Sequence, residues 1–184
     1  VPAFNVNRLC GSGLQAILTA AQSLMLGDAQ VAIGAGAESM SRGPYLSAAA
    51  RWGQRMGDMT MQDYMIGILH DPFHRIHMGM TAENVAERFG ITREQMDALA
   101  TESHRRAATA IAAGRFKEQV VPVTIKTRKG DVVFDTDEHV KADTTVETLA
   151  KMKPAFKKEG GTVTAGNASG INDGAAAVVL ATGD

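Results

Sequence analysis

The chain of 184 residues is 45% hydrophobic and carries 19 basic and 20 acidic side chains, for a formal net charge of -1. This composition is sufficient for a globular core, and the balanced charge gives no electrostatic case for binding nucleic acid or an anionic membrane. No apolar run approaches the ~20 residues of a membrane span, so we expect no membrane partner. A single cysteine cannot form an internal disulfide, and we expect a reducing, cytoplasmic location.

That cysteine, Cys10, lies at a predicted junction between a strand at residues 4–7 and a helix that ends before Gly27. The first turn of a helix presents free backbone N–H groups and the positive end of the helix dipole, which favour a thiolate. Gly11 and Gly13 leave the sulfur open to a substrate carbonyl. The pattern favours a catalytic nucleophile over the alternative, a small buried apolar residue.

Two apolar runs, residues 29–36 and 173–181, are typical of strands covered on both faces, and the first completes a strand, helix, strand unit of parallel type. We therefore expect an α/β core. Because strands of this kind stand near both ends, we predict that the chain is a piece of a longer protein. A processed but complete small domain is the alternative.

Residues 39–76 lack clear periodicity and contain a methionine cluster, which is typical of a segment that lines a site or a subunit contact. A helix is then predicted at 81–89, and a second one at 92–114 with capping-box residues at its start. The sequence at 120–134 predicts a hairpin with its turn at 129–131.

The order of these predicted strands, helices and loops indicates three segments along the chain. Residues 1–39 form a core with the strand, the cysteine, the helix and the next strand. Residues 40–170 form an inserted loop domain, and residues 171–184 return to the core sheet.

Four motifs in order give a specific resemblance. They are Asn-Arg-Leu-Cys-Gly-Ser-Gly at residues 7–13, Gly-Ala-Glu-Ser-Met-Ser at 36–41, His-Met-Gly-Met-Thr-Ala-Glu-Asn at 77–84 and Thr-Ala-Gly-Asn-Ala-Ser-Gly-Ile-Asn-Asp-Gly-Ala at 164–175. Over nearly its whole length the chain resembles the thiolase family, and among its members the bacterial biosynthetic β-ketothiolases, also called acetyl-CoA acetyltransferases.

The resemblance implies an α/β thiolase-like fold, with part of the N-terminal core layer and an inserted α+β loop domain that binds CoA and makes oligomer contacts. It implies that Cys10 carries the acyl group as a thioester. The enolate of acetyl-CoA then attacks this thioester in a Claisen condensation, and thiolysis of a 3-ketoacyl-CoA is the reverse reaction. The backbone N–H of Cys10 is a candidate donor to the developing oxyanion.

The resemblance also assigns the coenzyme A contacts. His77 and Met78 correspond to residues along the pantetheine and acyl pocket, and Ala165 and Ser169 to residues along the pantetheine arm. Lys141 corresponds to a basic residue near the adenine and phosphates, where many relatives have arginine. Without the resemblance to the family, the alternative interpretations are an ordinary turn around Ser169 and a solvated surface lysine at Lys141.

The resemblance implies a homotetramer that uses coenzyme A and acyl-CoA as substrates and holds no permanent cofactor. Three histidines at 70–77 suggest a metal, but structural zinc usually takes four ligands and no cysteine cluster accompanies them, so we predict no metal site.

Three family segments are absent from the sequence: Gly-His-Pro, Asn-Glu-Ala-Phe and Cys-x-Gly-Gly-Gly. We therefore expect the C-terminal thiolase domain to be missing and the isolated chain to be inactive. The alternatives are a non-catalytic thiolase-like protein that binds acyl-CoA or lipid, and a ketoacyl-synthase-type condensing enzyme. The motifs leave open the acyl-chain length and the pathway, whether polyester-precursor synthesis or fatty-acid breakdown.

Overall fold

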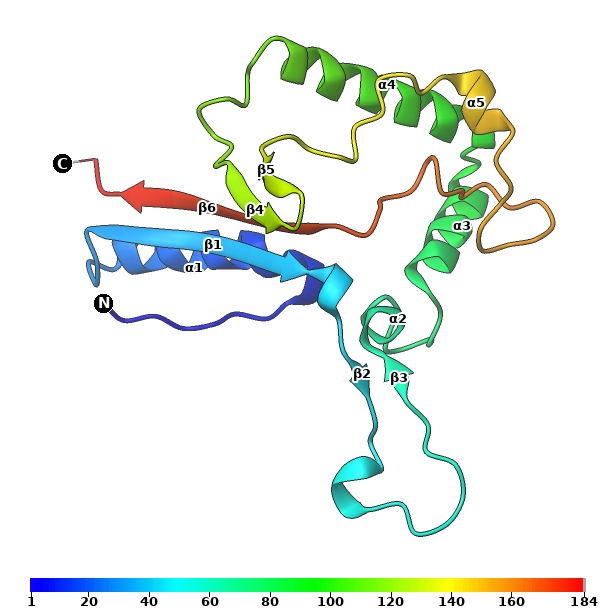
Figure 1. Ribbon diagram of the computed structural model, residues 1–184, viewed down its shortest axis with the longest axis horizontal. Helices are drawn as coiled ribbons and strands as arrows, with labels where there is room; N and C mark the ends of the chain where they lie inside the picture. The colour runs from blue at the N-terminus through cyan, green and yellow to red at the C-terminus, as the bar shows by residue number, and fades with distance from the viewer. Residues whose placement is uncertain (184) are drawn as a thin grey trace. The chain divides into compact units, whose positions relative to one another are not determined.

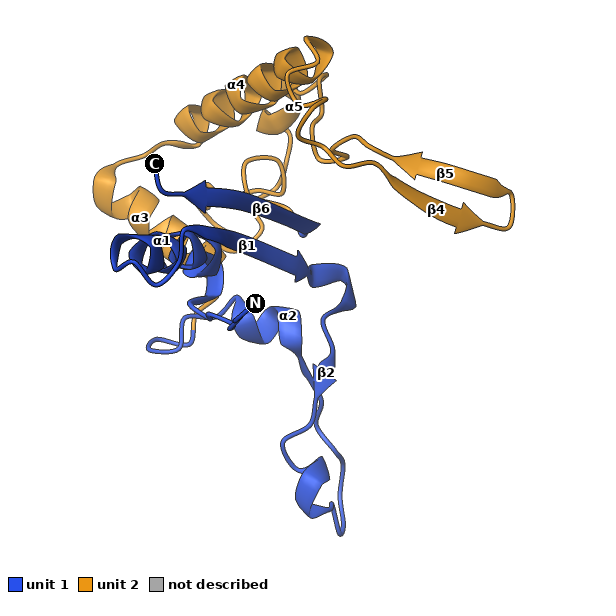
Figure 2. Cartoon of the chain, turned by 90° about the vertical axis from the view of Figure 1, so that its left-hand side faces the viewer, with its two compact units in different colours: residues 1–75, 171–184 blue, residues 76–170 orange. Residues whose placement is uncertain are grey.

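A computed structural model describes residues 1–183 and divides the chain into two compact units (Figures 1 and 2). The first unit comprises residues 1–75 and 171–184, and the second unit comprises residues 76–170. Residues 40–75, predicted as part of the inserted domain, group with the first unit, and residues 171–184, predicted as the return to the core sheet, group with it as well.

The first unit is built on a two-stranded sheet. Strands β1 (Val31–Ser39) and β6 (Asp173–Ala181) pair in antiparallel register along their whole lengths. The Asp173 carboxylate accepts hydrogen bonds from the backbone N and the hydroxyl of Ser41, and these bonds lower the pKa of Asp173. The segment that returns to this sheet is thereby fixed beside the end of β1.

Two sequence predictions about this sheet are wrong. The described residues contain no parallel strand, helix, strand unit, because the partner of β1 is the antiparallel β6. Residues 4–7 form no strand, since no described strand runs beside them to complete a hydrogen-bonded ladder.

Helix α1 (Ser12–Met25) lies along one face of the sheet, and Gly27, with φ 77°, follows its end as predicted. At Gly34 the strand approaches the helix so closely that a Cβ would lie 2.9 Å from the Cα of Ile17. The strands are not covered on both faces, however: Ile33 is 67% exposed and Val179 is 70% exposed. Within the described residues α1 packs on a single face of the sheet, and the cover predicted for the other face stays a prediction.

A narrow hairpin projects from this sheet in both views (Figures 1 and 2). Strands β2 (Tyr45–Leu46) and β3 (Gln62–Asp63) form its base, and a 3₁₀ turn, η3 (Ala50–Trp52), lies in its loop. Helix α2 (Tyr64–Ile68) follows directly. The excursion predicted without periodicity is therefore an extended arm.

The second unit has three helices whose ends match local signals. Helix α3 (Met78–Phe89) ends at Gly90 in the left-handed conformation, φ 65°. Helix α4 (Arg93–Ala112) starts with the complete Thr92 and Gln95 capping box, and helix α5 (Val146–Ala150) starts with a capping box of its own. Both longer helices are confirmed, and α3 begins three residues before the predicted start.

The predicted hairpin is confirmed as β4 (Val123–Thr127) and β5 (Gly130–Phe134). Its turn lies at Arg128 and Lys129, before the predicted position, since Gly130 already pairs with Thr127. Gly130 has φ 115°, a conformation that glycine adopts without strain.

The buried centre of the second unit mixes apolar and polar side chains. Its members are Ala86, Leu149 and Val163 together with Glu83, Asp97 and Thr164. On α4 the buried residue is Asp97, whereas Leu99 is 72% exposed. Among the described residues, no helix has the length and apolar character needed to cross a bilayer.

We predict that Gly34→Ala lowers the free energy of unfolding by about 1–3 kcal/mol, because the new methyl group meets the backbone of α1. Gly36→Ala is the matched control on the same strand, since its Cβ would meet only the Cα of Gly13 at 3.6 Å. The midpoint of urea unfolding measures the stability of each variant. Equal midpoints for the two variants contradict the close approach.

Candidate active site

Cys10 is exposed in a 3₁₀ turn, η1 (Leu9–Gly11), that runs directly into α1. Polar side chains hold this turn. The Asn7 carbonyl oxygen Oδ1 accepts from the backbone N of Leu9 at 2.9 Å, and Ser12 Oγ accepts from the backbone N of Arg8 at 2.8 Å. Ser12 Oγ also donates to the Leu9 carbonyl at 2.7 Å. The sulfur therefore stands on a turn whose conformation is fixed from both sides.

Leu9, the residue before the cysteine, has φ 51°. A non-glycine residue in this left-handed region costs about 1–2 kcal/mol, so the turn holds local strain. Residues in such conformations cluster at active sites, where the surrounding bonds hold them in place. The strained turn and the exposed thiol together mark Cys10 as the nucleophile candidate.

His77 stands immediately before α3 as its N-cap. Its Nδ1 accepts a hydrogen bond from the backbone N of Gly79 at 3.0 Å. The ring stacks on Phe156 with centroids 4.7 Å apart. Gly79 permits this contact, because a Cβ there would lie 2.2 Å from the Phe156 ring. Met78, the first residue of α3, is exposed.

Lys141 is exposed, and its ammonium donates to the carbonyl of Glu138 at 3.0 Å. Its backbone N donates to Nδ1 of His104 on α4 at 3.1 Å. The lysine backbone is thus tied to a long helix, whereas its charge is solvated and available to an anion.

Ala165 and Ser169 are both exposed on the segment that follows the buried Thr164. Gly166 between them presses against α5, since a Cβ there would lie 2.5 Å from a methyl carbon of Leu149. The Thr164 hydroxyl accepts from the backbone N of Gly166 at 3.2 Å. The segment therefore keeps its inner side fixed while it presents the two candidates to solvent.

Glu83 on α3 is 3% exposed and binds the start of the same segment. Its two carboxylate oxygens accept from the backbone N and the hydroxyl of Thr162 and from the backbone N of Val163, at 2.8–3.0 Å. Burial raises the pKa of Glu83, and the hydrogen bonds from Val163 and Thr162 lower it by more, so the pKa lies below its ordinary value. The carboxylate is thus held ionised by donors that replace water.

Asn167 binds the middle of the segment. Its Oδ1 accepts from the backbone N of Thr164 at 2.8 Å, and its Nδ2 donates to the Thr162 carbonyl at 3.0 Å and to Asp97 at 2.9 Å. Asp97, 2% exposed, also accepts from Arg93 Nε at 2.8 Å. The asparagine of the fourth motif is therefore a structural residue of the turn.

No cluster of potential metal ligands occurs within residues 1–183. In the histidine-rich stretch, His74 pairs with Asp71 at 2.7 Å on the surface.

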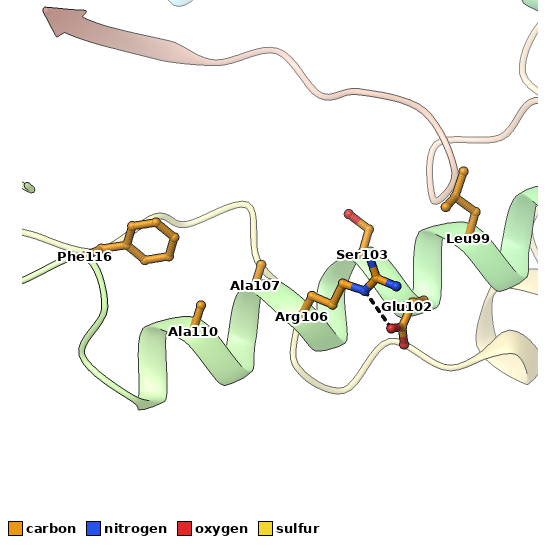
Figure 3. A pocket seen from close by; sticks show the side chains of 7 residues that line it. All are labelled: Leu99, Glu102, Ser103, Arg106, Ala107, Ala110 and Phe116. Carbon is orange, nitrogen blue, oxygen red and sulfur yellow. Dashed lines mark hydrogen bonds and ion pairs between the residues drawn. The ribbon is translucent and has the colours of Figure 1, made fainter. Parts of the chain in front are cut away.

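A separate hollow of about 440 Å³ runs along α4 (Figure 3). Glu102 lies on its wall and bonds Arg106 at 2.7 Å. Hydrogen bonds from Arg105 and Arg106 lower the pKa of Glu102 to about 2. None of the six candidate residues lines this hollow, so it is distinct from the candidate site.

The structure places Cys10 in the first unit and the other five candidates in the second. Sequence reasoning missed the buried residues Glu83 and Asp97 and the half-buried Phe156. Glu83 stands inside the third motif, and this was a usable signal. Asp97 has one local signal, its i,i+4 spacing from Arg93, whereas its bond to Asn167 and the stacking of Phe156 on His77 join residues far apart along the chain.

Comparison with known proteins gives consistent matches. A model described as the N-terminal domain of thiolase matches residues 1–184. The β-ketothiolase BktB of Cupriavidus necator is 68% identical over 97% of this chain and 45% of its own length. Among solved structures, Bacillus anthracis acetyl-CoA acetyltransferase superimposes with TM-score 0.90 at 48% identity, over 97% of this chain and 45% of that one.

Human mitochondrial 3-ketoacyl-CoA thiolase superimposes with TM-score 0.93 at 43% identity, over 99% of this chain and 46% of that one. The chain thus spans less than half the length of these relatives.

Proposed function

The chain belongs to the thiolase family and has an α/β thiolase fold, and we propose that the whole protein is a β-ketothiolase. It condenses an acyl-CoA with acetyl-CoA, or cleaves a 3-ketoacyl-CoA with CoA, through an acyl-Cys10 intermediate. The observation that carries this proposal is the exposed Cys10 on a strained turn at the start of α1. The printed names of the relatives, β-ketothiolase and acetyl-CoA acetyltransferase, support it.

In the first step the Cys10 thiolate attacks the thioester carbonyl of an acyl-CoA. A bond forms between Sγ and the carbonyl carbon, the bond to the CoA sulfur breaks, and the released CoA thiolate takes up a proton. Negative charge develops on the carbonyl oxygen, and the backbone N–H of Cys10 is the donor that we assign to it. The strained turn supports this role because it presents the sulfur and the backbone together.

In the second step the α-carbon of acetyl-CoA loses a proton and attacks acyl-Cys10. A carbon–carbon bond forms, the bond to Sγ breaks, and Cys10 leaves as a thiolate ready for the next turnover. The base that removes the α-proton is not among our six candidate residues.

We assign the coenzyme A contacts to the second unit. Met78 and His77 lie at the start of α3 and line the pantetheine and acyl pocket, where Met78 limits the acyl group by shape. Ala165 and Ser169 contact the pantetheine arm, and their exposure supports this. Lys141 contacts the nucleotide phosphates, and its solvated ammonium supports this role. Coenzyme A and acyl-CoA are substrates, no resident cofactor is required, and the reaction is cytoplasmic.

We also propose that the whole protein is a homotetramer in which the arm between β2 and β3 makes a subunit contact. Trp52 is 87% exposed and Met56 is 91% exposed on this arm. Large apolar side chains exposed together mark interaction surfaces. We predict that the double variant Trp52→Ser, Met56→Ser dissociates the tetramer, as measured by sedimentation equilibrium. An unchanged tetramer in the variant, or a monomeric wild-type protein, contradicts the assignment.

The mechanism predicts that a short acyl-CoA leaves one acyl group on Cys10 of the whole protein, detected by peptide mass spectrometry. Cys10→Ala removes the adduct and reduces thiolysis of acetoacetyl-CoA by at least about 1,000-fold, because the nucleophile is lost. Turnover without an adduct contradicts the covalent mechanism. Binding of acyl-CoA with neither adduct nor turnover identifies the non-catalytic alternative.

A further inference from the structure

Glu83 is a buried carboxylate that the proposed reaction does not use. We propose that it is a positioning residue for coenzyme A, because it fixes the segment that carries Ala165 and Ser169 against helix α3. This inference rests on the proposed function. It assigns to Glu83 no contact with the substrate, and its effect passes through the backbone of the segment.

Both oxygens of the Glu83 carboxylate bind the segment. Oε1 accepts from the backbone N of Val163 at 2.9 Å and of Thr162 at 3.0 Å, and Oε2 accepts from the same Thr162 N at 2.9 Å and from its hydroxyl at 2.8 Å. Hydrogen bonds to an ionised acceptor are stronger than neutral ones. One side chain of α3 therefore holds two consecutive backbone amides, beginning three residues before Ala165.

The backbone that Glu83 binds is also connected to the start of α3. The Val163 carbonyl accepts from the backbone N of Ala155 at 2.9 Å. The next residue, Phe156, stacks on His77 at the N-terminus of the helix. The start of α3 and Glu83 in its second turn thus both bind residues 155–163. These residues lead directly into the segment that carries Ala165 and Ser169.

Glu83 differs in role from the other polar residues that bind this segment. Asn167 bonds the backbone of Thr162 and Thr164, so it shapes the turn itself, and Asp97 ties that turn to α4. Among these contacts, those of Glu83 fix where the turn lies on α3, the helix whose first residues we assign to the acyl pocket.

Glu83→Gln tests this role because it keeps the size of the side chain and replaces one acceptor with a donor. Whichever way the amide turns, its NH₂ group lies against the backbone N–H of Thr162, which is a contact between two donors. In the orientation that puts the NH₂ group at the position of Oε1, the N–H of Val163 also loses its acceptor. The start of the segment then shifts or loosens, while the strained turn at Cys10 in the first unit keeps its own hydrogen bonds.

The assay uses the whole protein and two thiolysis substrates. Acetoacetyl-CoA carries the full pantetheine arm, and S-acetoacetyl-N-acetylcysteamine keeps the thioester but lacks the pantothenate and the nucleotide. We expect Glu83→Gln to lower kcat/KM for acetoacetyl-CoA by about 10-fold and for the truncated substrate by less than about twofold. A change in this ratio reports on the coenzyme A contact, which a loss of overall stability does not move.

Glu87→Gln is the matched control one turn further along α3. Glu87 is 73% exposed and pairs with Lys157 at 3.1 Å, an exposed ion pair of small value. The control removes the same charge from the same helix and leaves both kcat/KM values unchanged.

If Glu83→Gln does not fold, Thr162→Val decides the question, because it removes one hydrogen bond to Glu83 and keeps both backbone amides. A smaller selective loss for acetoacetyl-CoA is the expected result. Equal loss for both substrates, or no loss, overturns the positioning role. Wild-type protein that turns over neither substrate and forms no adduct on Cys10 overturns the proposed function itself, and this inference with it.

Discussion

The burial of the Glu83 carboxylate is the constraint on which the arrangement of the second unit depends. A carboxylate removed from water is stable only when protein donors replace the solvent, and the start of the segment that carries Ala165 supplies them. The position of that segment on α3 thus follows from the requirement to solvate a charge. Apolar contacts alone specify less, because they are non-directional and tolerate small shifts.

Hydrogen bonds between polar side chains and the backbone also fix the turn at Cys10. Leu9 is held in an unfavourable conformation, and the side chains of Asn7 and Ser12 supply the hydrogen bonds that maintain it. In both units, polar groups with defined directions fix the backbone that carries the exposed candidates. Reactive or binding residues are thereby presented to solvent on segments whose inner side is rigid.

Local signals predicted local structure well. The capping residue Thr92 and the terminal Gly90 located helix boundaries, because caps depend on neighbours within one turn. The four motifs predicted the family and contain five of the six candidate residues, all but Lys141. Predictions that needed a distant partner were wrong or missing: the antiparallel pairing of β1 with β6, and the bonds of Glu83 to a residue 79 positions away. Periodicity along the chain does not indicate which distant strand or backbone amide will pair with a given residue.

The most direct test of the account is hydrogen exchange at the amides of Thr162 and Val163 in the whole protein, compared between wild type, Glu83→Gln and Glu87→Gln. The account predicts slow exchange in wild type and Glu87→Gln, and exchange at least about 10-fold faster in Glu83→Gln. Equal exchange of these amides in wild type and Glu83→Gln contradicts it, because the buried carboxylate then does not hold the segment.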